Sequence, residues 1–200
     1  MRIPRKPLFL CFCFFLLTAA CVHKSTPAAE TEVRVLHSSY DALSAQHETA
    51  RTVYILLRDQ TNKAQALQLR LGKAFESRGF SLAASPSQAG YIVQCNIVFA
   101  GDMPVGEPER VVPAGYGKAV GQSGSGVSAL IADVIIAIRA IPSAVNKKHG
   151  ESLVSGAKRS KMDDIHLRMA ACVPAAESSF VVQQSTLESR LSTAVAELVP

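Results

Sequence analysis

Residues 51–100 carry the pattern that most constrains the fold, because strand-like and helix-like segments follow one another there within a short distance. Residues 52–57 (TVYILL) are β-branched, aromatic or aliphatic, which is typical of a β-strand. In residues 63–79, apolar side chains recur at helical spacing, and Gly79 provides a helix end. Two further strands are predicted at residues 80–84 and 91–100. The stretch therefore predicts a compact β-α-β-β unit.

The rest of the chain adds further periodic segments to this unit. On the strand at 91–100, the residues expected to share the core face are Tyr91, Val93, Cys95, Ile97 and Phe99. A final amphipathic helix is predicted from apolar residues at near-heptad spacing, which are Leu187, Leu191, Val195 and Leu198. Because strands are also expected shortly before this helix, the predicted fold class is α+β.

The middle of the chain is predicted to be a glycine- and proline-rich loop, residues 101–126, followed by an apolar segment, residues 127–141. Asp133 and Arg139 interrupt the apolar segment, and Pro142 ends it. We interpret it as an apolar helix of about 22 Å, too short to cross a bilayer alone. Packed core, subunit interface and membrane contact remain three alternatives for this helix.

The first twenty residues have the composition of a bacterial lipoprotein signal peptide. Arg2, Arg5 and Lys6 precede an uncharged apolar run at residues 8–20, and small residues stand directly before Cys21. In such a signal the cysteine thiol takes a diacylglycerol, and cleavage then makes Cys21 the acylated N-terminus. The alternatives are an ordinary secretory signal and an anchor helix. The apolar run covers only about 20 Å as a helix, short of the roughly 30 Å of a bilayer core, which disfavours the anchor helix.

These features predict three segments: a signal peptide at 1–20, a lipidated tether at 21–49 and a folded domain at 50–200. The tether is mixed polar sequence, within which a short helix is expected at residues 32–46. Val22 follows the predicted acylated cysteine. Because aspartate at that place retains enteric-type lipoproteins at the inner membrane, its absence favours the outer membrane.

The charge of the predicted mature chain gives no indication of nucleic-acid binding. The formal net charge falls from +5 to +2 when the signal peptide leaves with Arg2, Arg5 and Lys6. There is no clustered basic face with interleaved aromatic residues, and the chain has no tryptophan.

Two cysteines, Cys95 and Cys172, would remain in the folded domain. An oxidising envelope compartment permits a disulfide between them. Such a bond requires Cα atoms within roughly 7 Å, so the two strands would have to be neighbours in the sheet. The alternative is two separate buried thiols that pack as small apolar groups.

Several stretches of this sequence resemble the TraT family of outer-membrane lipoproteins. The matching stretches are Arg51 to Tyr54, Arg78-Gly79-Phe80, Ser85-Pro86, Tyr91 to Val98 and, more weakly, Ser155 to Lys158. The resemblance implies a palmitate-carrying lipoprotein linked to complement resistance and to surface exclusion in conjugation. It also implies a homo-oligomer whose partners are mating-pair or complement proteins.

The chain departs from that family in its middle segment. Family members have a long Gly/Ala-rich apolar region there, thought to be a hairpin that contacts the membrane, and another strand after it. Here the glycine-rich character is kept only at Gly115-Tyr116-Gly117 and in the cluster Gly121 to Gly126. Residues 143–161 then read as a basic loop where the family would place a strand.

No motif in the sequence indicates an enzyme, a cofactor or a metal site. Ser155-Gly156-Ala157-Lys158 matches S-x-x-K, the acyl-enzyme motif of penicillin-binding proteins, but the companion motifs are missing. Gly124 to Ala129 fits a loose dinucleotide fingerprint without the strand that should precede it. The five histidines form no H-E-x-x-H, and no C-x-x-C occurs.

We therefore expect a lipid-anchored protein that acts by non-catalytic binding, as a shielding or exclusion factor at the cell surface. One alternative is a lipoprotein subunit of an envelope export or assembly complex. Another is a lipoprotein hydrolase that uses Ser155 and Lys158.

Overall fold

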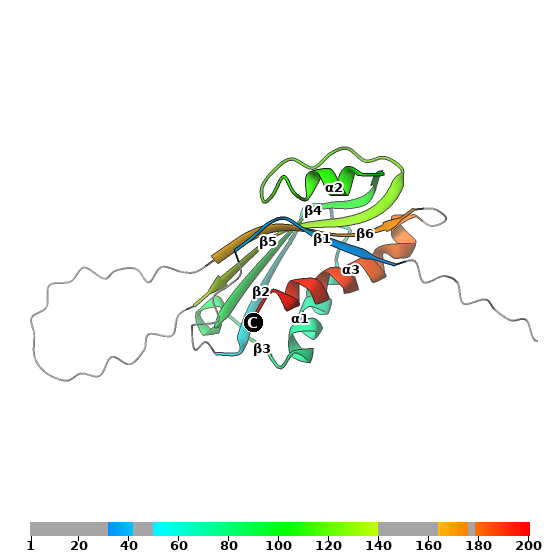
Figure 1. Ribbon diagram of the computed structural model, residues 1–200. Helices are drawn as coiled ribbons and strands as arrows, with labels where there is room; N and C mark the ends of the chain where they lie inside the picture. Colours follow the sequence, from blue (N-terminus) through cyan, green and yellow to red (C-terminus); the bar gives the residue numbers. More distant parts are fainter. Residues whose placement is uncertain (1–31, 42–49, 140–163, 176–178) are drawn as a thin grey trace, which may run out of the picture. The chain divides into compact units, whose positions relative to one another are not determined.

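The structure is a computed structural model that describes residues 32–41, 50–139, 164–175 and 179–200. These residues form a six-stranded sheet with the strand order β1-β6-β5-β4-β2-β3 (Figure 1). The strands are β1 (Arg34–His37), β2 (Thr52–Asp59), β3 (Ser81–Leu82), β4 (Tyr91–Pro104), β5 (Gly126–Ile138) and β6 (Asp164–Pro174). The α-helices are α1 (Leu67–Ser77), α2 (Glu107–Val111) and α3 (Phe180–Glu197), and Pro86–Gln88 form a 3₁₀ turn. The predicted α+β class is confirmed.

The predicted β-α-β-β unit is also present, as β2, α1, β3 and β4. β2 lies parallel to both β3 and β4, so α1 is the crossover that returns the chain to the same end of the sheet. Gly79 follows α1 with a φ of +80°, a left-handed conformation that glycine adopts without strain. The glycine thus ends the helix at the position that the sequence indicated.

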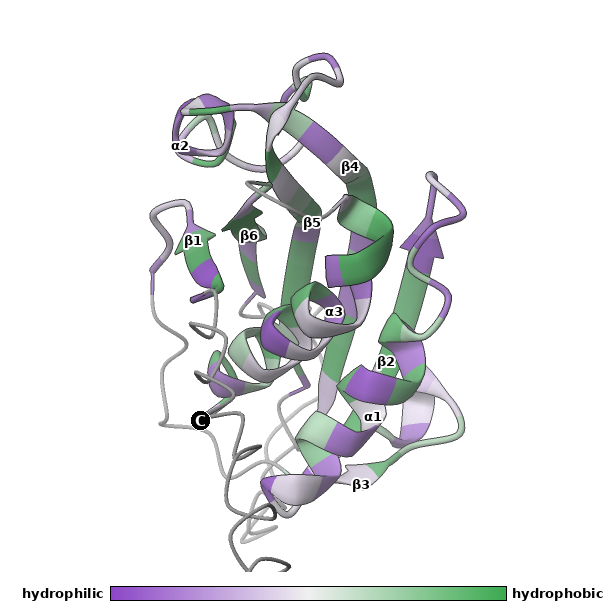
Figure 2. Cartoon of the chain, turned by 90° about the vertical axis from the view of Figure 1, so that its right-hand side faces the viewer, coloured by the Kyte–Doolittle hydropathy of each residue, from purple (hydrophilic) through white to green (hydrophobic). Residues whose placement is uncertain are grey.

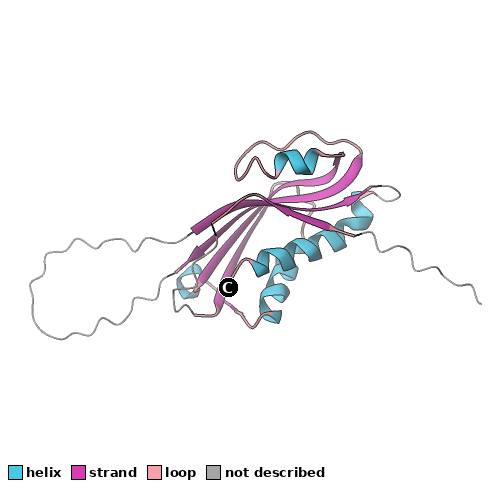
Figure 3. Cartoon of the chain, viewed as in Figure 1, coloured by secondary structure: helices cyan, strands magenta, loops and turns pink. Residues whose placement is uncertain are grey.

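Helices α1 and α3 cover one face of the sheet, which we call the inner face (Figure 3). Along both helices apolar residues alternate with polar ones (Figure 2), and the buried apolar residues belong to the core with the strands. Leu71 and Phe75 of α1 and Leu187 and Leu191 of α3 are fully buried against this face. The apolar stripe predicted for the last helix is therefore a core stripe.

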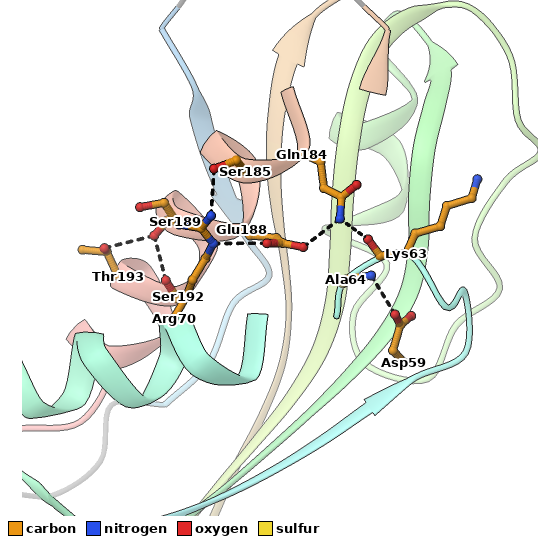
Figure 4. A network of polar contacts seen from close by, with 10 residues as sticks. All are labelled: Asp59, Lys63, Ala64, Arg70, Gln184, Ser185, Glu188, Ser189, Ser192 and Thr193. Carbon is orange, nitrogen blue, oxygen red and sulfur yellow. Dashed lines mark hydrogen bonds and ion pairs between the residues drawn. The ribbon is translucent and has the colours of Figure 1, made fainter. Parts of the chain in front are cut away.

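A polar network joins the two inner-face helices (Figure 4). The carboxylate of Glu188 on α3 is 1% exposed and accepts a hydrogen bond from Arg70 Nε on α1 at 3.1 Å. Gln184 donates to the other oxygen of Glu188 at 3.0 Å and also to the carbonyl of Lys63. These bonds fix the start of α1 against α3, and they satisfy a carboxylate that would be costly to bury alone.

The prediction of an apolar helix at 127–141 was wrong, because residues 127–138 of that segment belong to the central strand β5. β5 pairs antiparallel with both β4 and β6 and is largely buried on both faces. A short continuous apolar run is compatible with a buried strand as well as with a buried helix, and hydrophobic periodicity alone cannot separate them. The β-branched residues of this segment favour a strand. The two neighbouring strands supply its backbone hydrogen bonds.

The prediction that Phe99 shares the core face of its strand was also wrong. The pairing of β4 with β5 shifts register between Ile97 and Phe99, as at a β-bulge. Tyr91, Val93, Cys95 and Ile97 lie in the inner-face core as expected. Beyond the bulge, Phe99 packs with the apolar cluster of the opposite face. A bulge inserts one residue, and the alternation of faces is therefore reversed after it.

The N-terminal boundary differs as well, because β1 lies inside the segment that was predicted to be tether and short helix. Arg34 to His37 pair antiparallel with Cys172 to Met169 at the edge of the sheet. Val33 is only 9% exposed and joins the inner-face core. Pairing with β6 supplies backbone hydrogen bonds that no local signal could indicate, so the folded domain begins before residue 50.

The two cysteines do not form a disulfide. Both thiols are free, and β5 lies between the strands that carry them. Cys95 belongs to the inner-face core, whereas Cys172 belongs to the cluster on the opposite face. Burial raises the pKa of Cys95 to about 12, and the carboxylate of Asp133 adds to that shift. Separate buried thiols, the second alternative, are what the structure contains.

Several predictions concern residues outside the described ranges. They are the signal peptide, Cys21, the tether before residue 32, the basic loop at 143–161, and Ser155 with Lys158.

Candidate interaction surface

The face of the sheet opposite α1 and α3, the outer face, carries side chains in rows that follow from the strand register. One row is Tyr54, Ile92, Ala137 and Asp164, the next is Leu56, Gln94, Ile135 and His166, and the third is Arg58, Asn96, Asp133 and Arg168. Because side chains alternate between faces along a strand, members of one row are neighbours across the sheet. These rows define what the outer face presents.

A cap made of α2 and the loop up to residue 125 lies over the part of this face that contains Met103, Ile131 and Ala170 (Figure 1). Val111 and Val112 of the cap are 1% exposed and pack on Met103, Ile131 and Ala170 of the strands. This second core is the reason that β5 is buried on both faces there. The loop predicted at 101–126 is thus an ordered cover that includes the end of β4 and a helix.

A buried ion pair fixes the cap to the sheet. Arg168 on β6 is 0% exposed, and its Nε lies 2.7 Å from Oδ1 of Asp133 on β5. A second guanidinium nitrogen donates to Asp133 Oδ2 at 2.9 Å and to the carbonyl of Lys118 in the cap at 2.7 Å. Gly117 N–H donates to Asp133 Oδ2 at 2.9 Å. We call these four residues the latch, because every member bonds across the boundary between cap and sheet or supports a bond that does.

The backbone of the cap is shaped by glycine near the latch. Gly115 and Gly117 have φ values of +88° and +74°, which place both in the left-handed region. Between them, the ring of Tyr116 contacts the ring of His166 edge-on, with centroids 5.0 Å apart. This contact lies where the cap ends and the uncovered part of the outer face begins.

The uncovered part consists of the first two rows. Its four large apolar members, Tyr54, Leu56, Ile92 and Ile135, are half-buried by their neighbours on the strands, and no helix of the described ranges covers them. Gln94 and His166 are the polar members of the second row. We call these six residues the open strip. A surface that mixes half-buried apolar groups with polar ones is suited to contact with another protein.

The described residues show no cluster of side chains of the metal-binding type. No three His, Cys, Asp or Glu side chains in those ranges gather as metal ligands would. Every buried side-chain nitrogen or oxygen there has a hydrogen-bond partner.

Sequence reasoning missed the latch, although a signal for it was present. Asp133 was treated as an interruption of an apolar helix, and Arg168 was not singled out. In a strand, Asp133 has the same parity as Ile131 and Ile135, so one face of β5 carries a lone acid. A lone acid and a lone base in two adjacent apolar strands indicate a buried pair.

The TraT family profile, described as enterobacterial TraT complement resistance protein, matches residues 43–197, more than half of the chain. The chain belongs to the TraT family. The resemblance noted in the sequence is thereby confirmed, and membership places this TraT-family chain among proteins of the bacterial envelope. The family is named for complement resistance and not for an enzymatic activity.

Curated relatives agree with this assignment. A TraT complement resistance protein from Escherichia coli is 24% identical over 106 residues, which are 52% of this chain and 43% of that protein. The TraT complement resistance protein of Escherichia coli strain K12 is 26% identical over 116 residues, 56% of this chain and 48% of that protein. The TraT-family chain thus spans slightly less than half the length of these relatives.

Solved structures show only weak likeness. A PelC dodecamer from Paraburkholderia phytofirmans has a TM-score of 0.37 at 10% identity, covering 82% of this chain and 98% of that one. A minor lipoprotein from Acinetobacter baumannii has a TM-score of 0.34 at 10% identity, covering 74% and 90%. A DUF4136 family protein from Bacteroides thetaiotaomicron has a TM-score of 0.36 at 10% identity, covering 82% and 92%. TM-scores this low do not establish a shared fold.

In the part of the TraT-family chain that the structure describes, no helix combines the length and the apolar character needed to span a membrane.

Proposed function

We propose that this chain is an outer-membrane lipoprotein, anchored through Cys21, that shields the cell surface by non-catalytic binding. It acts against complement or against the contacts that form a mating pair. The observation that carries the proposal is the match to the TraT family, named for complement resistance, over residues 43–197. The lipoprotein signal before Cys21 supports the anchor.

The open strip is the surface through which we propose that the protein self-associates. Arg58 and the carboxylate of Asp164 lie at opposite corners of the outer face, on β2 and on β6, and both are exposed. Two copies placed face to face by a two-fold axis would set Arg58 of each copy against Asp164 of the other. The apolar members of the open strip would then pack across the contact, and the charged corners would fix its register.

The test is survival of a strain that lacks the gene and carries either the wild-type chain or a variant. Cys21→Ser removes the predicted lipid acceptor, and Ile135→Asp places a charge in the middle of the open strip. Leu69→Asp is the matched control, since Leu69 is 64% exposed on α1, which lies on the inner face. Survival in serum, recipient activity in conjugation and oligomeric state in detergent are measured for each.

We expect wild type and Leu69→Asp to restore serum survival or exclusion, and both test variants to fail. Ile135→Asp should run as a folded species of lower mass, because an aspartate at a subunit contact leaves an unpaired charge. If the strain that carries the wild-type chain shows neither serum survival nor exclusion, the proposal is refuted. Protection of the chain from protease on intact cells, with digestion only after the envelope is opened, would instead favour the export or assembly subunit.

A further inference from the structure

We infer that one end of the domain rests on the lipid surface in which the chain is anchored. This end is formed by the tip of β4, the loop before β5 and the start of α3. We name it the valine end after Val105, Val181 and Val182. The inference rests on the proposed anchoring through Cys21, and it adds which end of the domain faces the lipid.

The elements of the valine end are fixed to one another. Pro104 at the tip of β4 pairs with Gly126 at the start of β5. Asp102 on β4 accepts a hydrogen bond from the hydroxyl of Ser128 at 2.5 Å and another from the N–H of Phe180 at 3.2 Å. The carboxylate of Asp102 therefore caps α3 from the neighbouring sheet and holds the first turn of that helix beside the tips of β4 and β5.

The three valines are the most exposed large apolar residues of the described ranges. Val105 is 78% exposed, Val181 is 77% and Val182 is 68%. Isolated exposed apolar residues are common on soluble domains and carry no meaning singly. Here the three come from two segments that Asp102 holds together, so the exposure is concentrated at one end. The next most exposed, Leu69, lies on α1.

The segments that carry the valines are free of charged residues, although charged side chains lie beside them: Asp102 bonds the N–H of Phe180, Lys63 lines a hollow with Val181, and α2 begins at Glu107. Met103–Gly106, residues 119–132 and the first eight residues of α3, Phe180 to Leu187, contain no Asp, Glu, Lys or Arg. Moving a charged group from water toward hydrocarbon is costly, whereas valine gains free energy there and amide or hydroxyl groups suit the headgroup region. The two segments that carry the valines therefore fit a lipid surface better than the charged side of α1 does.

A hollow of about 590 Å³ lies between the valine end and the start of α1. Its lining includes Lys63, Gln184 and Ser179 together with Val181. An ammonium group on a flexible apolar stem can reach a phosphate while its stem stays against apolar surface. The ammonium of Lys63 would thus meet lipid headgroups when the valines contact the apolar region beneath them, beside the carboxylate of Asp102, which also lines the hollow.

The point at which the tether joins the domain lies at the same end. Arg34, at the start of β1, pairs with Cys172, close to where β6 ends at Pro174. The start of β1, the end of β6 and the start of α3 lie at the same end of the sheet, on the right in Figure 1. Cys21 precedes Glu32 by eleven residues, a reach of at most about 40 Å even when fully extended. Fatty chains on Cys21 would hold this end closest to the lipid.

The experiment measures the depth of single positions in the full lipidated chain. Val181→Cys and Val105→Cys are labelled with an environment-sensitive fluorophore, and Leu69→Cys is the matched exposed control. Cys95 and Cys172 are at most 3% exposed and should not take the label in the folded protein, which unsubstituted protein verifies. Each sample is reconstituted into phosphatidylethanolamine–phosphatidylglycerol vesicles that carry a nitroxide quencher on the acyl chain.

We expect a blue-shifted emission and strong quenching for the labels at 105 and 181, and neither effect for the label at 69. Equal behaviour of all three labels, or quenching at 69 alone, would overturn the inference. A blue shift without nitroxide quenching that disappears on dilution of the protein would mean that a second copy covers this end, which also overturns it. Palmitate incorporation is read in the same samples, and its absence would contradict the anchor itself rather than the orientation.

Discussion

Breaking the latch should loosen the cap and lower the stability of the whole domain, and the size of the effect follows from the burial of Arg168. In Asp133→Ala the guanidinium keeps its bond to the carbonyl of Lys118 but loses both carboxylate oxygens, at 2.7 Å and 2.9 Å, in a place that is 0% exposed. Removing one partner of a buried pair typically costs about 3–5 kcal/mol. For a domain of this size that corresponds to a melting temperature lower by about 6–20 °C.

Urea unfolding followed by circular dichroism measures the loss as a lower midpoint at unchanged slope. The double variant Asp133→Leu with Arg168→Met is the decisive comparison. It removes both charges and keeps apolar volume, so it should lose much less free energy of unfolding than Asp133→Ala alone. Glu107→Gln is the control, because its partner Arg110 is exposed and the pair lies on the surface of the cap. We expect this control to unfold like wild type.

Limited trypsin digestion reports on the cap directly, since Lys118 is exposed and its carbonyl is one of the atoms that the latch holds. Cleavage after Lys118 should be faster in Asp133→Ala and close to wild type in the double variant. An Asp133→Ala protein that unfolds at the wild-type urea midpoint would refute the reasoning. So would a double variant that loses as much stability as the single one, because the cost would then not come from an unpaired charge.

Two further predictions concern the central strands. Ile136 is 0% exposed in the inner-face core while Ile135 lies on the open strip, so Ile136→Asp should abolish the cooperative melt seen by circular dichroism and Ile135→Asp should keep it. Folding raises the pKa of the Cys95 thiol from its ordinary value of 9.0 to about 12, so the native state holds this proton where the unfolded chain releases it. The contribution of this thiol to the free energy of unfolding is fully present below pH 9 and is lost as the pH rises toward 12. Cys95→Ala should therefore flatten the decline of the urea midpoint measured from pH 8 to 11. A pH dependence identical to wild type would contradict the second prediction, and a cooperative Ile136→Asp melt would contradict the first.

The β-α-β-β unit could be predicted from the sequence because its signals are local. The alternation in β2, the apolar spacing of α1 and the glycine after that helix each specify one element without reference to the rest of the chain. The stripe of α3 was found in the same way. Where the local pattern agrees with the tertiary environment, element type and buried face are both readable.

The elements that could not be predicted depend on distant pairing. β1 has only four residues, and its hydrogen bonds come from β6 more than a hundred residues later. The hydrophobic periodicity of β5 does not separate it from a buried helix until the strands on both sides of it are known. The bulge that turns Phe99 to the other face leaves no mark in the alternation before it. In each case the deciding contact is nonlocal, so a window of sequence does not contain it.

The open strip also results from nonlocal contacts. Its extent depends on how much of the outer face the cap covers. From the third row onward, the outer face carries groups that need cover, namely the buried Arg168 with Asp133 and then apolar residues such as Ile131 and Ala170. The connection between β4 and β5 supplies a cap that covers the β5 and β6 members of those rows, whereas Arg58 on β2 stays exposed, and the cap ends at the contact of Tyr116 with His166. Apart from the contact of Tyr116 with His166, the cap does not extend over the first two rows, although they carry apolar groups too. In the described chain, the contact of Tyr116 with His166 is therefore the boundary between the covered rows and the open strip that we propose as the surface of self-association.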